Sequence, residues 1–156
     1  LYFASKNYKE ALPNYLKTQQ VAKSDAIKNS IKESLKSTYF QLGSASYNEK
    51  KWDAAIENFN KSNEQIEYDQ AYLWLGKTYT EKKKYDLALQ NFDKALSVKK
   101  TVTDGAIGYY KGSVYKQKGD LDKAIEFFKQ GLTDEKYKKA CQSEIANTTA
   151  LKKQKK

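Results

Sequence analysis

A three-part spacing recurs three times in this chain: a glycine, an alanine twelve residues later, and a phenylalanine four residues after the alanine. The three sets are Gly43, Ala55 and Phe59; Gly76, Ala88 and Phe92; and Gly112, Ala124 and Phe128. A unit that returns at a nearly regular period indicates a modular architecture, in which each unit buries its apolar face against its neighbours. The spacing therefore predicts a stack of similar units.

The middle unit shows what each copy is expected to form. Its apolar residues recur at intervals of three and four, which places them on one face of a helix. They are Tyr72, Leu75 and Tyr79 on the first segment, and Ala88, Phe92 and Ala95 on the second. A glycine and an alanine at a helix crossing let the two backbones approach to about 8 Å. A short polar turn at 80–85 joins the segments, so each unit predicts an antiparallel helix pair.

The middle unit, Tyr72-x2-Leu75-Gly76-x2-Tyr79 followed by Ala88-x3-Phe92, resembles the tetratricopeptide repeat, a helix–turn–helix unit of about 34 residues. The resemblance implies an all-α fold, a right-handed α-α superhelix of stacked antiparallel helix pairs closed by a C-terminal capping helix. It also implies a protein–protein interaction scaffold whose first helices line a concave groove. The chain departs from the family pattern because no proline closes any repeat.

We expect one domain over residues 1–156. A partial repeat occupies 1–23, where Tyr2 and Ala11 match the end of a repeat; full repeats follow at about 25–68, 69–102 and 104–133, and a capping helix at 134–153. The capping helix carries the apolar face Tyr137, Ala140, Cys141, Ile145 and Leu151, and a solenoid needs such a cap with a polar outer face. Because the chain starts inside a repeat and contains no methionine, we expect a fragment of a longer protein.

Three local features modify this expected arrangement of repeats. The long first repeat predicts an extended helix from about Asp25 to Tyr47, capped by Ser24 or Asp25. Its expected apolar stripe is Ile27, Ile31, Leu35, Tyr39 and Leu42. Pro13 should kink the helix of the partial repeat or shift its start. The last repeat has Gly108 and Lys111 in place of a tyrosine and a leucine, and its glycines at 105, 108 and 112 should loosen its first helix.

Composition argues against an enzyme. The chain has no histidine, so neither a Ser-His-Asp nor a Cys-His arrangement can form. One cysteine with carboxylates would be an implausible zinc site, and no glycine-rich phosphate loop is present. We therefore predict no catalytic residue, no metal and no cofactor, and we interpret Cys141 as a small core residue.

The candidate binding residues are those on the first helices that the partner helix does not use. The predicted groove consists of Phe40, Ser44, Tyr47 and Asn48; Gln70, Leu73, Lys77, Thr80 and Glu81; and Tyr109, Ser113, Lys116 and Gln117. Tyrosine and phenylalanine offer a large contact area with few rotatable bonds, which suits recognition. Because Lys77 and Lys116 lie among aromatic residues, we expect a peptide or helix with apolar anchors flanked by acidic residues.

The sequence can be compared with one specialised peptide-binding groove of this family. Tetratricopeptide co-chaperones that hold the acidic tail of heat-shock chaperones use a clamp of lysine, asparagine and arginine on three successive first helices. The corresponding places here hold Phe40 and Ser44, then Trp74, then Ala106 and Tyr110. None of these matches the clamp, so the resemblance does not extend to chaperone-tail binding.

A second surface follows from the charge. The formal net charge is +10, and all 29 basic residues are lysine. Six of these lysines fall at the turns inside repeats and should form a basic edge: Lys50, Lys51, Lys82, Lys83, Lys84 and Lys118. The edge is either a solvated surface or a strip that attracts RNA or another polyanion. The absence of arginine, which makes bidentate contacts with phosphates and bases, disfavours nucleic acid. Self-assembly through an exposed end helix is a further alternative.

The sequence says little about location. No apolar run approaches the length of about 20 residues that crosses a bilayer. The content of lysine, asparagine, isoleucine and tyrosine suggests a low-GC genome and a bacterial source, with the cytoplasm and the cell envelope both open as compartments.

Overall fold

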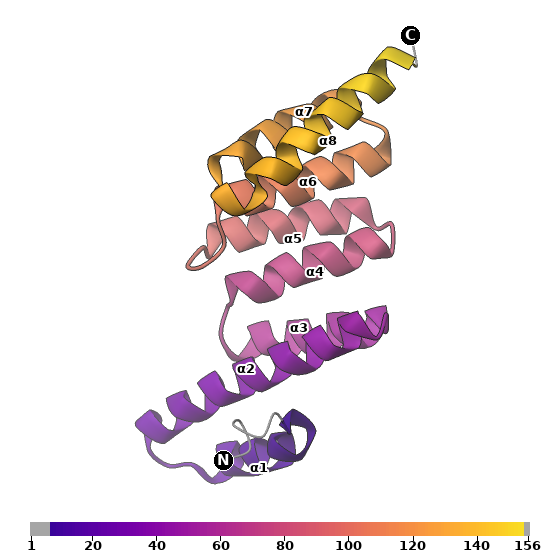
Figure 1. Cartoon of the computed structure of the whole chain (residues 1–156). Coiled ribbons are helices and arrows are strands. Elements are labelled where there is room, and N and C mark those ends of the chain that lie inside the picture. Colours follow the sequence, from indigo (N-terminus) through magenta and orange to yellow (C-terminus); the bar gives the residue numbers. More distant parts are fainter. Residues whose placement is uncertain (1–6, 155–156) are drawn as a thin grey trace.

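The computed structural model describes residues 7–154, which form eight α-helices, one short 3-10 helix and no strand. The helices are α1 (Tyr8–Val21), α2 (Asp25–Asn48), α3 (Trp52–Gln65), α4 (Asp69–Glu81), α5 (Tyr85–Ser97), α6 (Asp104–Lys118), α7 (Leu121–Gln130), η1 (Gly131–Thr133) and α8 (Glu135–Gln154). They stack from α1 to α8 in chain order (Figure 1). The predicted all-α stack of antiparallel pairs is confirmed.

The glycines of the recurring spacing lie against the phenylalanines of the partner helices. A Cβ atom placed on each glycine would lie 2.7 Å from Phe59 at Gly43, 2.3 Å from Phe92 at Gly76, and 2.6 Å from Phe128 at Gly112. These distances are shorter than any normal carbon contact, so only glycine lets the rings pack there. The three phenylalanines and the three alanines are fully buried. The spacing thus encodes the crossings of α2 with α3, α4 with α5, and α6 with α7.

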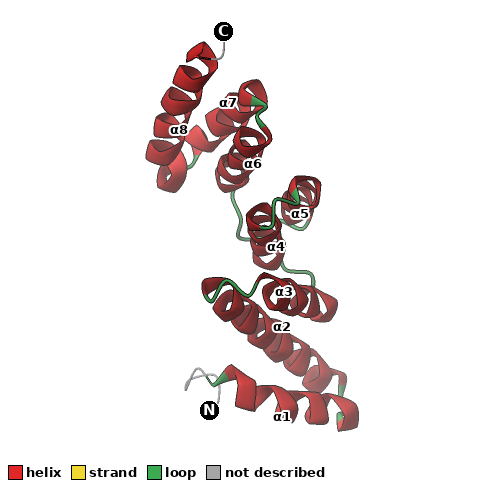
Figure 2. Cartoon of the chain, turned by 90° about the vertical axis from the view of Figure 1, so that its right-hand side faces the viewer, coloured by secondary structure: helices red, strands yellow, loops and turns green. Residues whose placement is uncertain are grey.

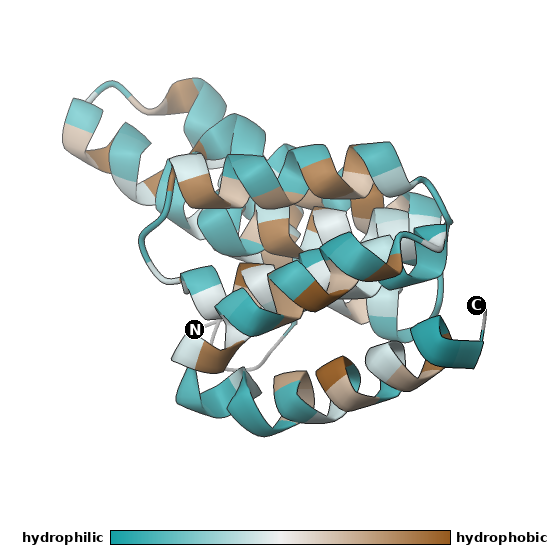
Figure 3. Cartoon of the chain, turned by 90° about the horizontal axis from the view of Figure 1, so that it is seen from above, coloured by the Kyte–Doolittle hydropathy of each residue, from teal (hydrophilic) through white to brown (hydrophobic). Residues whose placement is uncertain are grey.

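Each first helix after α2 is also buried against the preceding pair. Leu73 and Phe92 share one apolar cluster with Ile107 and Val114 of α6, so this cluster joins two helix pairs. A second cluster joins Phe59 of α3 to Leu75 of α4. Figure 2 shows the resulting succession of pairs, with α8 beside α6 and α7 at the C-terminal end. Apolar residues recur along each helix between hydrophilic ones, as Figure 3 shows from above.

The long helix α2 confirms the prediction for the first repeat, with two corrections. Ile31, Leu35 and Tyr39 are buried, but Ile27 is 51% exposed because the first turns of α2 extend beyond α3 (Figure 1). Ser24 occupies the N-cap position but forms no side-chain cap hydrogen bond. The first turns of α2 therefore project from the stack with few apolar contacts.

Two expectations concerned helix breaking. Helix α1 begins at Tyr8 and continues through Pro13, so the proline does not shift its start, and a kink at Pro13 stays a prediction. Helix α6 is continuous through its glycines, which lie close to neighbouring segments. A Cβ atom at Gly108 would lie 2.8 Å from the carbonyl oxygen of Phe127. Tyr2, which was matched together with Ala11 to the end of a repeat, lies outside the described residues.

A buried carboxylate ties the stack together between α4 and α6. Asp69 is fully buried and accepts hydrogen bonds from the backbone amides of Lys100, Thr101 and Val102, and from the Thr101 hydroxyl. Burial alone would raise the pKa of this carboxyl, but the hydrogen bonds outweigh burial and hold the pKa below its usual range. Asp69 thereby anchors the loop that leads from α5 to α6.

The last helix completes the stack. Cys141 of α8 is buried beside Phe128, as expected for a core cysteine, and burial raises the pKa of its thiol. Tyr137 and Ile145 pack against the same cluster, whereas Leu151 is 40% exposed. Within residues 7–154, no helix combines the length and apolarity that crossing a membrane requires.

Candidate functional site

Seven of the thirteen predicted groove residues meet in one hollow that is lined by three first helices. The central hollow has a volume of about 220 Å³ and is lined by Tyr47 of α2, by Lys77, Thr80 and Glu81 of α4, and by Tyr109, Tyr110, Ser113 and Gln117 of α6. Every one of these residues except Tyr110 belongs to the predicted groove. Three successive first helices therefore contribute to one surface, although α2 and α6 are separated in the sequence by a complete helix pair.

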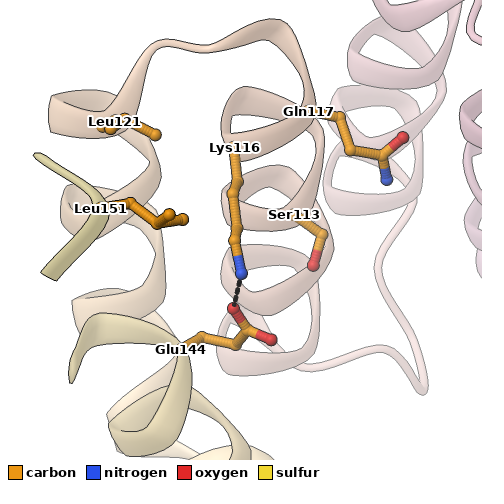
Figure 4. Close-up of a pocket in the computed structure, with 6 residues that line it drawn as sticks. All are labelled: Ser113, Lys116, Gln117, Leu121, Glu144 and Leu151. Atoms are coloured by element: carbon orange, nitrogen blue, oxygen red, sulfur yellow. Dashed lines mark hydrogen bonds and ion pairs between the residues drawn. The ribbon is translucent and has the colours of Figure 1, made fainter. Parts of the chain in front are cut away.

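A second hollow continues from the first toward the C-terminal end. This terminal hollow has a volume of about 430 Å³, and it shares Ser113 and Gln117 with the central one. Leu121 of α7 and Leu151 of α8 lie together on its other side (Figure 4). The two hollows form one surface that changes from aromatic to aliphatic along its length.

An ion pair crosses the terminal hollow. Lys116 Nζ lies 2.6 Å from Glu144 Oε2, and both side chains are 29% exposed (Figure 4). The pair links α6 to α8, so Lys116 is already neutralised by the chain itself. Its availability to an acidic ligand is reduced accordingly.

Three aromatic rings surround the ammonium group of Lys77 in the central hollow. Its Nζ is 3.5 Å from the ring centre of Trp74, 5.3 Å from that of Tyr47 and 5.4 Å from that of Tyr110. Cation–π contacts of this kind stabilise an ammonium group that has lost part of its water. Burial lowers the pKa of Lys77, the charge of Lys136 acts in the same direction, and Glu81 opposes them.

The tyrosines around Lys77 form a packed aromatic wall. Tyr110 packs against Tyr109 and Tyr137, with ring centres at 5.3 and 5.8 Å, and its hydroxyl is 3.4 Å from that of Tyr137. Burial raises the pKa of Tyr110, and the hydrogen bond with Tyr137 adds to this effect. Burial also raises the pKa of Tyr47. The hydroxyl groups of Tyr47 and Tyr110 therefore stay protonated at neutral pH.

The remaining predicted groove residues lie elsewhere. Leu73 is only 7% exposed within the cluster that joins two helix pairs, so its assignment to the groove is wrong. Phe40 packs against Phe59 and Tyr68, with ring centres at 5.7 and 5.2 Å. The Gln70 amide donates to Thr101 Oγ1 at 2.9 Å. Ser44 and Asn48 line neither hollow.

Two aromatic residues of the site were missing from the prediction. Trp74 and Tyr110 each lie two residues before the glycine of their repeat. That shared position is the signal that could have identified them, because it faces away from the partner helix toward the same side as Lys77. Glu144 and Leu151 of α8 carried no such signal, since the capping helix has no counterpart in the other repeats.

The six lysines of the basic edge lie at the turns between paired helices. Lys50 and Lys51 follow α2, Lys82 to Lys84 follow α4, and Lys118 ends α6. Lys83, Lys84 and Lys118 line one shallow hollow, so neighbouring turns meet at this edge. The backbone φ is 58° at Lys50, 57° at Lys83 and 85° at Gly119, and these residues hold the same place in their repeats.

Ion pairs neutralise part of the basic edge. In each full repeat an aspartate lies two residues before the alanine and pairs with a lysine of the following unit. This Lys–Asp ladder consists of Asp53 with Lys82, Asp86 with Lys118, and Asp122 with Lys152. Lys51 pairs with Glu49 at 2.6 Å. Binding of a polyanion to this edge stays an untested prediction, and the pairs reduce the charge that the edge can offer.

At the junction between α1 and the α2–α3 pair, the corresponding positions of the ladder carry the opposite charges. Lys9 stands where the aspartates stand, and Glu49 stands where Lys82 and Lys118 stand. The pKa of Glu49 is lowered mainly by its hydrogen bond and charge interaction with Lys51, and the charge of Lys9 adds to the lowering. At this junction a lysine thus replaces the aspartate of the ladder, and a glutamate replaces its lysine.

Comparisons with known proteins agree on the architecture. The family model of the tetratricopeptide repeat matches residues 69–101 and 109–133. The TPR domain of Arabidopsis OM64 superposes with a TM-score of 0.69 at 16% identity, over 76% of this chain and 98% of that one. YrrB, described as a TPR protein with an unusual peptide-binding site, superposes with a TM-score of 0.67 at 19% identity, over 98% of this chain and 73% of that one.

A further similar structure is a double mutant of MamA RS-1, with a TM-score of 0.67 at 19% identity, over 94% of this chain and 76% of that one. No curated protein sequence is detectably similar to the chain. At these identities the solved structures show the shared superhelical fold alone.

Proposed function

The chain is a tetratricopeptide-repeat protein, and from this premise we propose that its concave surface binds a peptide or helix of a partner protein. Proteins of this family act in general as interaction scaffolds, and YrrB is described as having a peptide-binding site. We further propose that the chain acts by binding alone and catalyses no reaction. In this role the two hollows would accommodate consecutive parts of one partner segment.

The observation that carries this proposal is the continuity of the two hollows. Ser113 and Gln117 belong to both, so a segment can run from the aromatic wall at Tyr47 and Tyr110 to the aliphatic side at Leu151. Large, rigid aromatic side chains with polar neighbours are the composition that binding hot spots favour. The surface also crosses α2, α4, α6 and α8, so binding would depend on the intact stack.

The test should block the surface without damaging the fold. Truncating Tyr47 or Tyr109 to alanine is a poor choice because both rings pack within the protein, Tyr47 against Trp74 and Tyr109 against Tyr137. Gln117 is exposed, and Gln117→Trp would place bulk between the two hollows. The matched control is Gln90→Trp, at an exposed position of α5 that lines neither hollow.

We expect a random library of 12-residue peptides to yield peptides that bind the unmodified chain. Those peptides should shift the amide NMR signals of α4 and α6 around Lys77 and Ser113. Gln117→Trp should abolish binding with an unchanged melting temperature, and Gln90→Trp should leave binding intact. Peptides whose signals map to the turns at 49–51 and 82–84 would instead assign binding to the basic edge and contradict the proposal.

A further inference from the structure

The lysines of the concave surface differ in whether the chain itself supplies a counter-ion. Lys116 has Glu144 at 2.6 Å. Lys77 forms no ion pair and donates no side-chain hydrogen bond to any residue within 7–154. Burial lowers the pKa of Lys77; the charge of Glu81 favours the ammonium form, and that of Lys136 opposes it. Lys77 is therefore a partly buried cation whose hydrogen-bond donors have no acceptor among residues 7–154.

The aromatic rings hold the ammonium group but do not satisfy it. Ring faces attract a cation by their quadrupole, whereas an ammonium group has three donors that are best satisfied by oxygen acceptors. Trp74, at 3.5 Å from Nζ, and Tyr110, at 5.4 Å, limit the directions that the side chain can take. The rings thus position Nζ in a hollow that is open to a ligand. A carboxylate is the acceptor that matches both the charge and the donors.

Building on the proposed function, we propose that Lys77 binds the carboxylate of an aspartate or glutamate inside the partner segment, while an aliphatic side chain of the same segment lies between Leu121 and Leu151. An internal acidic residue fits better than a chain terminus because the surface continues past Lys77 on both sides, to Tyr47 of α2 and to the terminal hollow. A segment can therefore pass over Lys77 without ending there.

The aliphatic anchor follows from the terminal hollow. Leu151 is 40% exposed near the end of α8, and Leu121 lies beside it (Figure 4). The Lys116–Glu144 pair lies next to them and offers no net charge. An apolar side chain gains most from burial in such a place. The two ends of the surface thus select different residue types, which gives the bound segment one preferred direction.

The test uses a random library of 12-residue peptides with acetylated and amidated ends, so that every carboxylate belongs to a side chain. We expect the selected peptides to share one acidic residue and one aliphatic residue at a constant separation. Replacing that acidic residue by its amide should weaken binding by roughly tenfold or more. Lys77→Met, which keeps the apolar stem over Trp74, should cause a similar loss, and the two changes together should cause little further loss.

Lys94→Met is the matched control, because Lys94 also lies over a ring, that of Tyr72 at 5.7 Å, but on α5 outside the hollows. It should leave both affinity and acidic preference unchanged. A second readout needs no variant: the side-chain NH signal of Trp74 should shift with the acidic peptide and not with its amide form.

Each outcome decides the matter. Peptides that bind the concave surface without an acidic preference, or that keep this preference on Lys77→Met, would overturn the inference and leave the proposed function standing. A selected peptide shortened to end at the acidic position, and bound more tightly through its free C-terminal carboxylate than the original is through its side chain, would overturn it as well. A library that yields no binding peptide would contradict both the inference and the proposed function.

Discussion

Two neighbouring helix pairs, α2–α3 and α4–α5, carry the same crossing residues in helices of different length. Gly43 meets Phe59 in one pair, as Gly76 meets Phe92 in the other, yet α2 has 24 residues and α4 has 13. The family model matches 69–101, which holds α4 and α5, and does not include α2 or α3. The comparison shows that the crossing residues determine which helices pair, while helix length and the loops between pairs are determined by other residues.

The pairs also differ at the position nineteen residues before the alanine. In α4 this residue is Asp69, whose carboxylate accepts hydrogen bonds from the loop before α6. In α2 it is Lys36, where the backbone carbonyl accepts a hydrogen bond from Ser62 of α3 at 2.9 Å. The same place in the repeat therefore ties one pair to its successor and the other pair to itself.

The substitutions with the largest expected effect test whether the two helix crossings contribute equally to stability. Phe59→Ala and Phe92→Ala each remove a fully buried ring, and each should lower the free energy of unfolding by about 3–5 kcal/mol. Urea denaturation monitored by circular dichroism measures both. If one variant lost much less stability than the other, the crossings would not be equivalent despite their shared spacing.

The substitution with the next largest effect tests the hydrogen bonds between Asp69 and the loop before α6, which have no counterpart at Lys36 of α2. Asp69→Asn keeps the shape but removes the charge and turns an NH2 group toward amide donors, so it should cost about 2–3 kcal/mol. Since the folded pKa of Asp69 lies below its unfolded value of about 4, its contribution is present above that pH and is lost as the pH falls through the folded pKa. The variant should therefore show less loss of stability on acidification than the unmodified chain, and an identical acid profile would argue against this role.

Adding a methyl group at each crossing compares the pairs more finely. Gly43→Ala and Gly76→Ala force a Cβ atom to within 2.7 and 2.3 Å of a buried ring, and each should cost about 1–3 kcal/mol, with the greater loss at Gly76. Ala88→Leu should fall in the same range because Ala88 is fully buried. Thermal unfolding suffices for the ranking, and a larger loss at Gly43 would reverse the expected order.

The smallest expected effect concerns the part of α2 that has no counterpart in α4. Ile27 is 51% exposed on the projecting turns, so Ile27→Gln should change stability by no more than about 0.5 kcal/mol. The same measurement on Leu35→Ala, at a fully buried position of the same helix, should show a loss of about 2–5 kcal/mol. A clear loss at Ile27 would indicate that another surface covers these turns in solution.

The residues that define each crossing could be recognised from the sequence, as could the length of α2 and the capping helix, because these depend on local periodicity. The misplacement of Leu73 has a physical cause. The periodicity of a single repeat predicts one buried face on each first helix, toward its partner. A first helix inside a stack is also buried by the next pair, here by Ile107 and Val114. Leu73 lies on that second face.

Most residues that line the candidate site could be predicted from the sequence, but the ion pair within the site could not. Tyr47, Lys77 and Gln117 could be placed on one surface because the repeat relates α2, α4 and α6. The pairing of Lys116 with Glu144 could not, since a contact between side chains 28 residues apart depends on how α8 packs. That pairing separates the two groove lysines, which looked alike in the sequence.

The Lys–Asp ladder also bears on how such a chain could grow by duplication. A second copy of the α4–α5 pair inserted after the first would set Asp86 of one copy opposite Lys82 of the next, which is an attractive junction. A second copy of the α2–α3 pair would instead set Asp53 opposite Glu49, which is a repulsive one. The inner pair is therefore suited to tandem multiplication, whereas the first pair is confined by its charges to the place that it holds.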